Sequence, residues 1–359
     1  MDQHPMIGSP TSGEEKIMLG GTFRGKYRGF AVFLICCAIL LAAFAVSAVW
    51  MQSGEDGMRG LGSFWGNKQN SPTDEGKAPD ATPPSAEPPT NGKTPEPIPD
   101  GATPIVEMDL SAPSLGRSYI HNETVYHPNV EDLLGKALFH ASETADGPQV
   151  LILHTHTSER YLPSGSAYVE GEIGDAAYSR NAEEGVLSVG EELCRTLNEK
   201  GVTAIHCTVT HDDPTLGGSY SRAEQTVRRY LREYPSIRLV IDLHRDAVTT
   251  AEGALVRTVA SDGESAQVMA VVGSDGNGTA HPRWQENLAL ALQLRERLNQ
   301  RLAGACRPVS LRNASFHQEL APYSLLLEVG TVANSPEEAR AAARRVGECL
   351  AEMLQSSIA

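Results

Sequence analysis

The segment VLILHTHTSE, residues 150–159, joins an uninterrupted apolar run to two histidines and a glutamate. Consecutive aliphatic residues are typical of a strand that is buried on both faces, as in the middle of an α/β sheet. Two further apolar runs, IRLVIDLH at 237–244 and YSLLLEVG at 323–330, end in polar residues in the same way. Ligands bind at the carboxyl ends of strands in open α/β sheets. The three runs therefore predict a site at one edge of a sheet.

Amphipathic segments alternate with these strands along the chain. The spacing of apolar residues predicts further strands at VTAIHCTV (202–209), ALVRTVA (254–260) and AQVMAVVG (266–273), and helices over 185–201, 221–234, 284–302 and 336–354. Gly201 is placed to end the first of these helices. The fold class that we predict is α/β, with a mixed, mostly parallel sheet and helices on both faces. Residues 105–147 are expected to form a strand-rich lead-in segment.

The N-terminal part of the chain contains a candidate membrane anchor. Residues 30–51, FAVFLICCAILLAAFAVSAVWM, carry no charge. At a helical rise of about 1.5 Å per residue they span roughly 33 Å, enough to cross a bilayer. Basic residues precede this run, so residues 1–29 are expected to be a cytoplasmic tail and the rest extracytoplasmic. A cleaved signal peptide is the alternative, but its apolar region is usually shorter. We predict a single-pass protein of the cell membrane.

Residues 52–104 read as a tether. Ten of the 22 prolines lie between Pro72 and Pro104, and such a composition stays extended and does not form a packed core. Extended at about 3.1 Å per residue, it reaches on the order of 100 Å or more. The formal net charge of -15 argues against a nucleic-acid partner. The four cysteines after the tether, at 194, 207, 306 and 349, show no CxxC spacing and leave room for one or two disulfides.

The polar strand ends have the residue types of a zinc site. Strand alternation predicts that His154 and His156 point to one side. His156 and Glu159 form an H-x-x-E pair, while His244 and Glu328 end two other strands. Two imidazoles, a carboxylate and an open position for water are typical of catalytic zinc, and a nearby glutamate can accept the proton of the water. A serine-hydrolase elbow, G-x-S-x-G, is absent from the sequence.

Six segments spread over residues 148–358 recur together in one known family: HTHTSERYLP, VGEEL, SYSRAEQTVRRYL, IDLHRDAV, HPRWQENLALAL and LLLEVGTVANSPEEA. In sequence and order they resemble the stage II sporulation protein P family. The resemblance implies a zinc-dependent N-acetylmuramoyl-L-alanine amidase domain at 148–359, with a fold like that of cell-wall amidases and zinc carboxypeptidases. It also implies cleavage of peptide cross-links by some members. The implied process is engulfment during sporulation, with peptidoglycan as substrate and stage II sporulation proteins D and M as partners.

The resemblance also assigns roles to residues. The HTH segment and His244 supply zinc ligands, and Glu328 is the catalytic glutamate. We choose His156 as the ligand from HTH; His154 then contacts substrate, supports a ligand or is a buried histidine. Glu159 is our choice for the third ligand, and the glutamates at 183 and 184 remain alternatives.

Three more residues are candidates for substrate contacts. Arg245 and Asp246 follow His244 directly, and each has an alternative role in a local salt bridge. His317 stands in a Phe-His-Gln stretch where the family usually has Tyr-Asn-Gln. Two rival functions stay open. One is a wall-binding scaffold without catalysis, and the other is a zinc carboxypeptidase in which Arg245 would hold the free carboxylate of a stem peptide.

Overall fold

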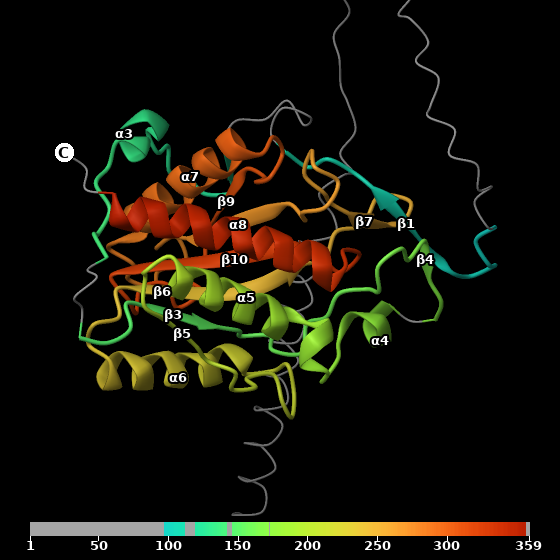
Figure 1. Cartoon of the computed structure of the whole chain (residues 1–359), viewed down its shortest axis with the longest axis horizontal. Helices are drawn as coiled ribbons and strands as arrows, with labels where there is room; N and C mark the ends of the chain where they lie inside the picture. The colour runs from blue at the N-terminus through green and yellow to red at the C-terminus, as the bar shows by residue number, and fades with distance from the viewer. Residues whose placement is uncertain (1–96, 112–118, 142–145, 172, 357–359) are drawn as a thin grey trace, which may run out of the picture. The chain divides into compact units, whose positions relative to one another are not determined.

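The computed structural model describes residues 97–111, 119–141, 146–171 and 173–356 (Figure 1). The predicted cytoplasmic tail, the apolar run at 30–51 and most of the tether lie outside these ranges. Within them, no helix is long and apolar enough to cross a membrane.

A seven-stranded sheet forms the centre of the described part. Its order is β2 (Ile120–Asn122), β9 (Val309–Arg312), β8 (Val268–Gly273), β10 (Tyr323–Thr331), β6 (Leu239–Asp246), β3 (Val150–Leu153) and β5 (Ala204–His206). Neighbouring strands are parallel except β8 and β10, which are antiparallel. The mixed, mostly parallel sheet predicted from the sequence is therefore confirmed. The strands β10, β6, β3 and β5 run in one direction, so their carboxyl ends meet at one edge.

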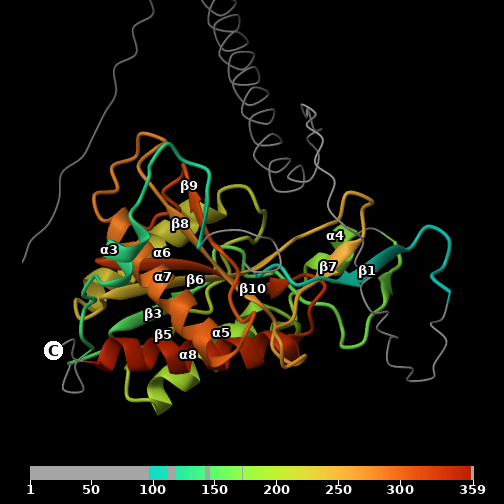
Figure 2. The same ribbon diagram turned by 90° about the horizontal axis from the view of Figure 1, so that it is seen from above.

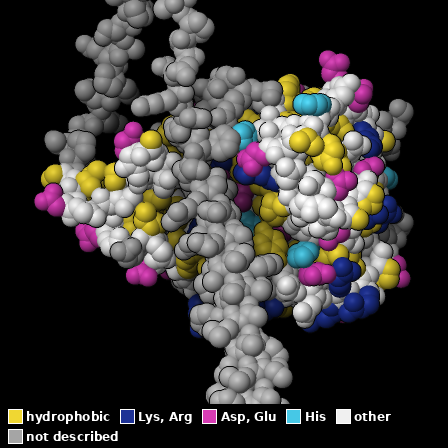
Figure 3. Space-filling view, turned by 180° about the vertical axis from the view of Figure 1, so that it is seen from behind, with side chains coloured by type: hydrophobic (Ala, Val, Ile, Leu, Met, Phe, Trp, Pro, Cys, Tyr) yellow, Lys and Arg dark blue, Asp and Glu magenta, His cyan; other side chains and the backbone are white. Residues whose placement is uncertain are grey.

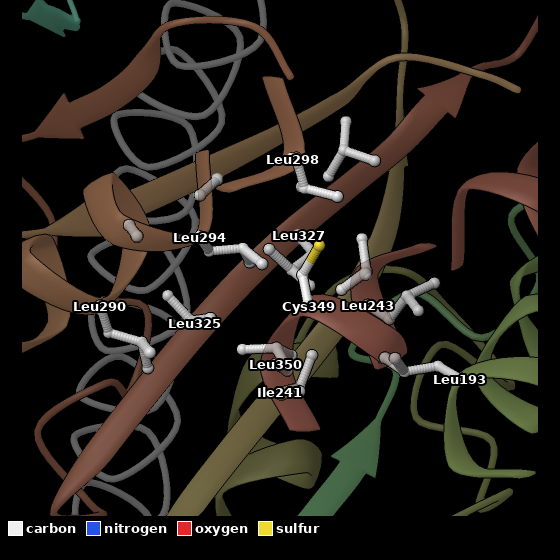
Figure 4. Close-up of a cluster of buried hydrophobic side chains, with 14 of the residues drawn as sticks. Leu193, Ile241, Leu243, Leu290, Leu294, Leu298, Leu325, Leu327, Cys349 and Leu350 are labelled. Atoms are coloured by element: carbon white, nitrogen blue, oxygen red, sulfur yellow. The ribbon is translucent and has the colours of Figure 1, made fainter. Parts of the chain in front are cut away.

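Helices cover both faces of this sheet, as predicted. One face carries α5 (Val186–Glu199), α7 (Trp284–Arg301) and α8 (Pro336–Gln355), and the other carries α6 (Ser219–Glu233) (Figures 1 and 2). Between the first three helices and the sheet, leucines of β6, β10, α5, α7 and α8 form a continuous buried cluster (Figure 4). Because residues alternate along a strand, the apolar positions in this cluster fix which strand residues point toward α6.

Local sequence sets the helix ends. Gly201 follows α5 with a φ of +85°, a conformation that glycine adopts without steric cost. At the start of α8, the Ser335 side chain accepts from the Glu338 N–H and the Glu338 side chain accepts from the Ser335 N–H. With Pro336 in the first turn, this capping box explains why α8 begins where it does.

A second, three-stranded sheet has the order β4 (Tyr168–Val169), β1 (Thr103–Glu107) and β7 (Leu255–Arg257). The strands predicted at 254–260 and 266–273 thus lie in different sheets. The lead-in segment contributes to both sheets through β1 and β2, and its short helix α3 (Val130–Leu134) packs against α7. Two short helices, α4 (Ile173–Ala177) and η1 (Ala182–Glu184), lie between β4 and α5. The four cysteines in the described part are free, so none of the disulfides that the sequence left room for is formed there.

Candidate active site at the carboxyl edge of the sheet

Two strand ends bring a histidine and a glutamate side by side. β6 and β10 are adjacent and parallel, and their register places His244 opposite Glu328. Leu243 and Leu327 belong to the core under α5, α7 and α8, so the next residue on each strand points to the α6 face. After Glu328 the register of β10 against β6 shifts, an irregularity that is common beside active sites.

His244 lies between two carboxylates. Its Nδ1 is 3.3 Å from Glu159 Oε2, and its Nε2 is 3.0 Å from Asp242 Oδ1. Only 3% of His244 is exposed. Burial lowers its pKa, but the charges of Asp242 and Glu159 act in the opposite direction, and the net pKa is well above the usual value. The two carboxylates therefore favour a positive charge at this position, which a protonated imidazole or a bound cation would supply.

Asp242 was missed by our reading of the sequence. It lies two residues before His244 in the same strand, so alternation alone places it on the same face. Thr155 donates to its two oxygens from the backbone N–H at 2.8 Å and from the hydroxyl at 2.7 Å. Burial opposes ionisation, but His244 and these hydrogen bonds lower the pKa of Asp242 below its ordinary value. Asp242 therefore remains ionised beside the imidazole.

Glu159 is the glutamate that reaches His244. The residue is 7% exposed, and its Oε2 accepts a hydrogen bond from the Arg245 N–H at 3.2 Å. Burial raises its pKa, whereas His244 and Arg245 lower it, and the net shift is downward. The two alternatives lie elsewhere: Glu183 is exposed, and Glu184 accepts from Asn181 and pairs with Arg160.

His156 completes the cluster from the loop after β3. Its ring lies 5.2 Å from that of His244, measured between centroids, and is nearly perpendicular to it. Its Nδ1 is 3.4 Å from Ser219 Oγ, and its ring meets the edge of Tyr220 at 5.7 Å, both at the start of α6. Burial and the neighbouring His244 lower the pKa of His156, so its imidazole is neutral at neutral pH, as a metal ligand must be.

His154 points to the α5 face of the sheet, away from His156. The prediction that the two histidines share a side was therefore wrong. β3 ends at Leu153 and a turn follows, so the period-2 alternation does not extend to His156. The His154 Nδ1 bonds Leu243 O at 2.7 Å, and its Nε2 lies 2.8 Å from His206 Nε2. Burial, followed by the charge of His206, lowers the pKa of His154 to about 3. It is a buried neutral histidine under α5.

Two further residues that our sequence analysis did not single out, His211 and Asp212, fix the turn that carries His156. His211 bonds the His154 carbonyl through Nδ1 at 2.7 Å, and its backbone N–H donates to Thr157 Oγ1 at 3.1 Å. Asp212 Oδ2 accepts from the N–H and hydroxyl of Ser158 at 2.9 and 2.6 Å. These contacts join segments more than 50 residues apart, and no local pattern predicts them.

Glu328 has the most perturbed carboxyl group in the site. Its Oε2 is buried and finds no hydrogen-bond partner among the described residues, although the residue as a whole keeps partial exposure. Burial, and then the negative charge of Asp246, raises its pKa to about 8. A carboxyl group with a pKa near the working pH is suited to accept and return a proton.

The side chains of Arg245 and Asp246 are already engaged. Arg245 is 4% exposed, and its guanidinium donates to the carbonyls of Arg160 at 3.0 Å and Ala177 at 2.5 Å. Asp246 pairs with Arg307 at 2.7 Å. Arg245 thus holds the loop that follows β3, and Asp246 acts on the charge of Glu328.

His317 lies across from His156 in a strained loop. Phe316 and His317 have φ values of 51° and 56°, which cost about 1–3 kcal/mol each for residues other than glycine. The rings of both approach Tyr220, at 6.4 and 5.8 Å. The buried Gln318 fixes this loop by accepting from Gly273 N–H at 2.8 Å and donating to Val271 O at 2.9 Å. The pKa of His317 is raised, mainly by a hydrogen bond to Glu319.

Tyr220 therefore separates the histidine cluster from the loop at 316–318. Burial raises the pKa of its phenol, and the charges of His244, Asp242, Glu328 and Glu159 also act on it. The phenol is consequently within electrostatic reach of these four side chains. On the face opposite α5, α7 and α8, histidine, acidic and hydrophobic side chains lie close together near the middle (Figure 3).

The donor set matches zinc by chemistry. Within the described ranges, no group of three or more His, Cys, Asp or Glu side chains is already arranged to hold a metal ion. His156, Glu159 and His244 nevertheless supply the nitrogen and oxygen donors that catalytic zinc takes. His244 Nε2 forms no hydrogen bond of good geometry despite its contact with Asp242, and its two carboxylate neighbours favour a cation.

Fold and site define an α/β protein with a histidine and carboxylate centre at the carboxyl edge of its sheet. The chain belongs to the stage II sporulation protein P family, whose model matches residues 68–354. The stage II sporulation protein P of Bacillus subtilis (strain 168) is 28% identical over 222 residues, which cover 58% of this chain and 52% of that relative. The match therefore spans about half the length of that relative.

Solved structures with weaker similarity include two amidases. The N-acetylmuramyl-L-alanine amidase Ami1 of Mycobacterium abscessus has 15% identity and a TM-score of 0.36, covering 58% of this chain and 99% of that one. The catalytic domain of CwlV, an N-acetylmuramoyl-L-alanine amidase of Bacillus (Paenibacillus) polymyxa, has 13% identity and a TM-score of 0.33, covering 57% and 96%. TM-scores this low carry no structural argument, and membership of the stage II sporulation protein P family rests on the family model.

Proposed function

We propose that the protein is a zinc-dependent peptidoglycan hydrolase that cleaves the amide between N-acetylmuramic acid and L-alanine. The observation that carries the proposal is the pairing of His244 and Glu328 on adjacent strands, facing α6. It joins a carboxyl group with a pKa of about 8 to the donor set of His156, Glu159 and His244. Membership of the stage II sporulation protein P family supports the substrate class.

The proposed ligands are His156, Glu159 and His244. Zinc bound there would polarise a carbonyl oxygen and make water a stronger acid. Asp242 supports His244 from the side of the ring opposite Glu159, and such supporting carboxylates orient histidine ligands. His211 and Asp212 hold the turn that carries His156. The chain thus supplies both the donors and the contacts that fix their directions.

Glu328 is the proposed general base and acid. It accepts a proton from the attacking water and returns it to the leaving amine nitrogen. Asp246 raises the pKa of Glu328, while Arg307 neutralises part of the charge of Asp246 and lowers that pKa. The Asp246–Arg307 pair therefore adjusts the basicity of Glu328 without touching substrate.

The cellular setting is also part of the proposal. The run at 30–51 would anchor the protein in the cell membrane, and the tether at 52–104 would let the catalytic domain reach peptidoglycan outside. Family membership supports a role in sporulation. Engulfment is the proposed process, and stage II sporulation proteins D and M are the proposed partners. Cleavage of peptide cross-links is a proposed second activity.

The carboxypeptidase alternative depends on Arg245. A free substrate carboxylate would have to compete with the carbonyls of Arg160 and Ala177 for its guanidinium. That arrangement favours the amidase over the carboxypeptidase. A scaffold without catalysis would have no need of a glutamate buried with an unpartnered oxygen.

Mass analysis of peptidoglycan digested by the purified protein tests the proposal. An amidase releases intact stem peptides and leaves glycan strands without peptide. A carboxypeptidase shortens stem peptides by one residue, an endopeptidase separates cross-linked dimers, and a scaffold changes no mass. Release of shortened peptides alone, or no change, would reject the amidase assignment.

A further inference from the structure

Tyr220 occupies a position that the proposed reaction has so far left without a role. It is the second residue of α6, and its ring stands between His156 and the loop that carries Phe316 and His317. The rings of Tyr220 and His244 both approach His156, at 5.7 and 5.2 Å between centroids, and the charges of His244 and Glu328 both act on the phenol.

Among the described residues, the hydroxyl of Tyr220 donates no hydrogen bond, whereas its ring contacts those of His156, Phe316 and His317. Tyr220 is partly exposed, and its hydroxyl is not one of the fully buried polar atoms that lack a partner. A tyrosine combines a ring that packs against its neighbours with a hydroxyl that can reach a polar group. The ring is held by its neighbours, and the hydroxyl is open to a bound molecule.

We propose that Tyr220 is a catalytic residue whose phenolic O–H donates a hydrogen bond to the oxygen of the scissile amide. This inference rests on the proposed amidase function. As the oxygen of water attacks the carbonyl carbon, the π electron pair moves to the carbonyl oxygen and a water proton passes to Glu328. The pair then re-forms the carbonyl, the bond from carbon to nitrogen breaks, and the nitrogen takes the proton from Glu328. A donor aimed at the oxygen stabilises the charge that develops on it.

Three neighbouring contacts favour a catalytic role for Tyr220 over a purely structural one. The Tyr220 ring is perpendicular to that of His156 at 5.7 Å between centroids, so it packs directly against a proposed ligand. Ser219, its neighbour, approaches Nδ1 of the same histidine at 3.4 Å, so the start of α6 is in contact with the ligand set. On the other side, the backbone strain at Phe316 and His317 brings aromatic rings against Tyr220, and strain of this kind persists where surrounding contacts enforce it.

The test compares Tyr220→Phe with Tyr234→Phe in the full-length protein. Both variants lose one phenolic hydroxyl from α6 or its C-terminal cap, and the first keeps the ring that packs on His156. We measure kcat and KM for release of stem peptide from purified peptidoglycan, and zinc content. We also measure the affinity for a muramyl dipeptide analogue whose scissile amide is replaced by an anionic phosphonamidate.

Tyr220→Phe is expected to lower kcat by about 100-fold, with KM and zinc content nearly unchanged. Its affinity for the phosphonamidate should fall by a similar factor, because the analogue carries the charged oxygen. Tyr234→Phe should match the parent in each measurement. An unchanged kcat overturns the inference, as does a loss confined to KM or accompanied by loss of zinc.

Measurements on the parent and on Glu328→Gln distinguish failure of the Tyr220 proposal from failure of the proposed amidase function. A parent that releases no stem peptide rejects the amidase proposal and Tyr220 with it. An active parent, an inactive Glu328→Gln and a normal Tyr220→Phe reject the role of Tyr220 alone.

Discussion

Replacement of His154 by Gln should change how the stability of the domain depends on pH. His154 is fully buried, and its pKa is lowered to about 3 by burial and by His206. Its Nδ1 must carry the hydrogen that Leu243 O accepts, so its Nε2 accepts from His206 Nε2. Protonation of His154 would break this arrangement, and the folded protein therefore resists it.

The magnitude follows from the two pKa values. As pH falls through about 6.5, the unfolded chain takes up a proton at this position, but the folded protein does not until about pH 3. Stability is lost between these values at about 1.4 kcal/mol per pH unit. From pH 6.5 to pH 5 the contribution of His154 is therefore about 2 kcal/mol.

Urea unfolding of a zinc-free fragment starting at Pro97 measures the effect, because zinc binding depends on pH itself. Glu328, with its raised pKa, acts in the opposite direction in this range, but it does so equally in the parent and in His154→Gln. The difference between their slopes isolates His154. The control is His140→Gln, at an exposed histidine, which should leave the slope unchanged. Equal slopes in the parent and His154→Gln would refute the reasoning.

Three further outcomes are expected. A Cβ on residue 190 would lie 2.6 Å from His154 Nε2 and 2.7 Å from His206 Nε2, so Gly190→Ala should lower the free energy of unfolding by about 1–3 kcal/mol. The matched Gly174→Ala, with open space around it, should not. Gln318→Leu leaves the Gly273 N–H and Val271 O without partners. It should destabilise the protein by about 1–3 kcal/mol per group in urea unfolding and lower turnover. The fragment from Pro97 should fold without the segment at 30–51, and a circular dichroism spectrum of an unfolded chain would contradict this.

The central strands of the sheet were predictable because each is visible in its own local sequence. Apolar runs at 150–153, 239–243 and 323–327 have no other stable environment than a covered sheet, and the amphipathic helices between them require both faces to be occupied. The sequence predicted a strand over the residues of β7 and a strand-rich segment that contains β2, but it did not predict β9, β4 or a separate second sheet. Strands of two to four residues carry too little periodicity to fix their bounds or their partners.

The site was predictable where strands carry it and not where loops do. His244 and Glu328 end adjacent strands, so their meeting follows from topology. The turn after Leu153 places His156 on the opposite side from His154, and this turn is held by His211 and Asp212 from a distant segment. Tyr220 likewise joins the cluster only through the packing of α6 on the sheet. Contacts between distant segments produce no local spacing pattern, so they cannot be predicted from the sequence of either segment.

The central claim is that Glu328 transfers the proton in a zinc-dependent hydrolysis. It is tested most directly by Glu328→Gln beside His244→Ala, with zinc measured by atomic absorption and hydrolysis by dye release from labelled peptidoglycan. We expect Glu328→Gln to keep its zinc and fold while its rate falls by on the order of 100-fold or more. His244→Ala should lose both zinc and activity. Near-normal dye release by Glu328→Gln at full zinc occupancy would contradict the account.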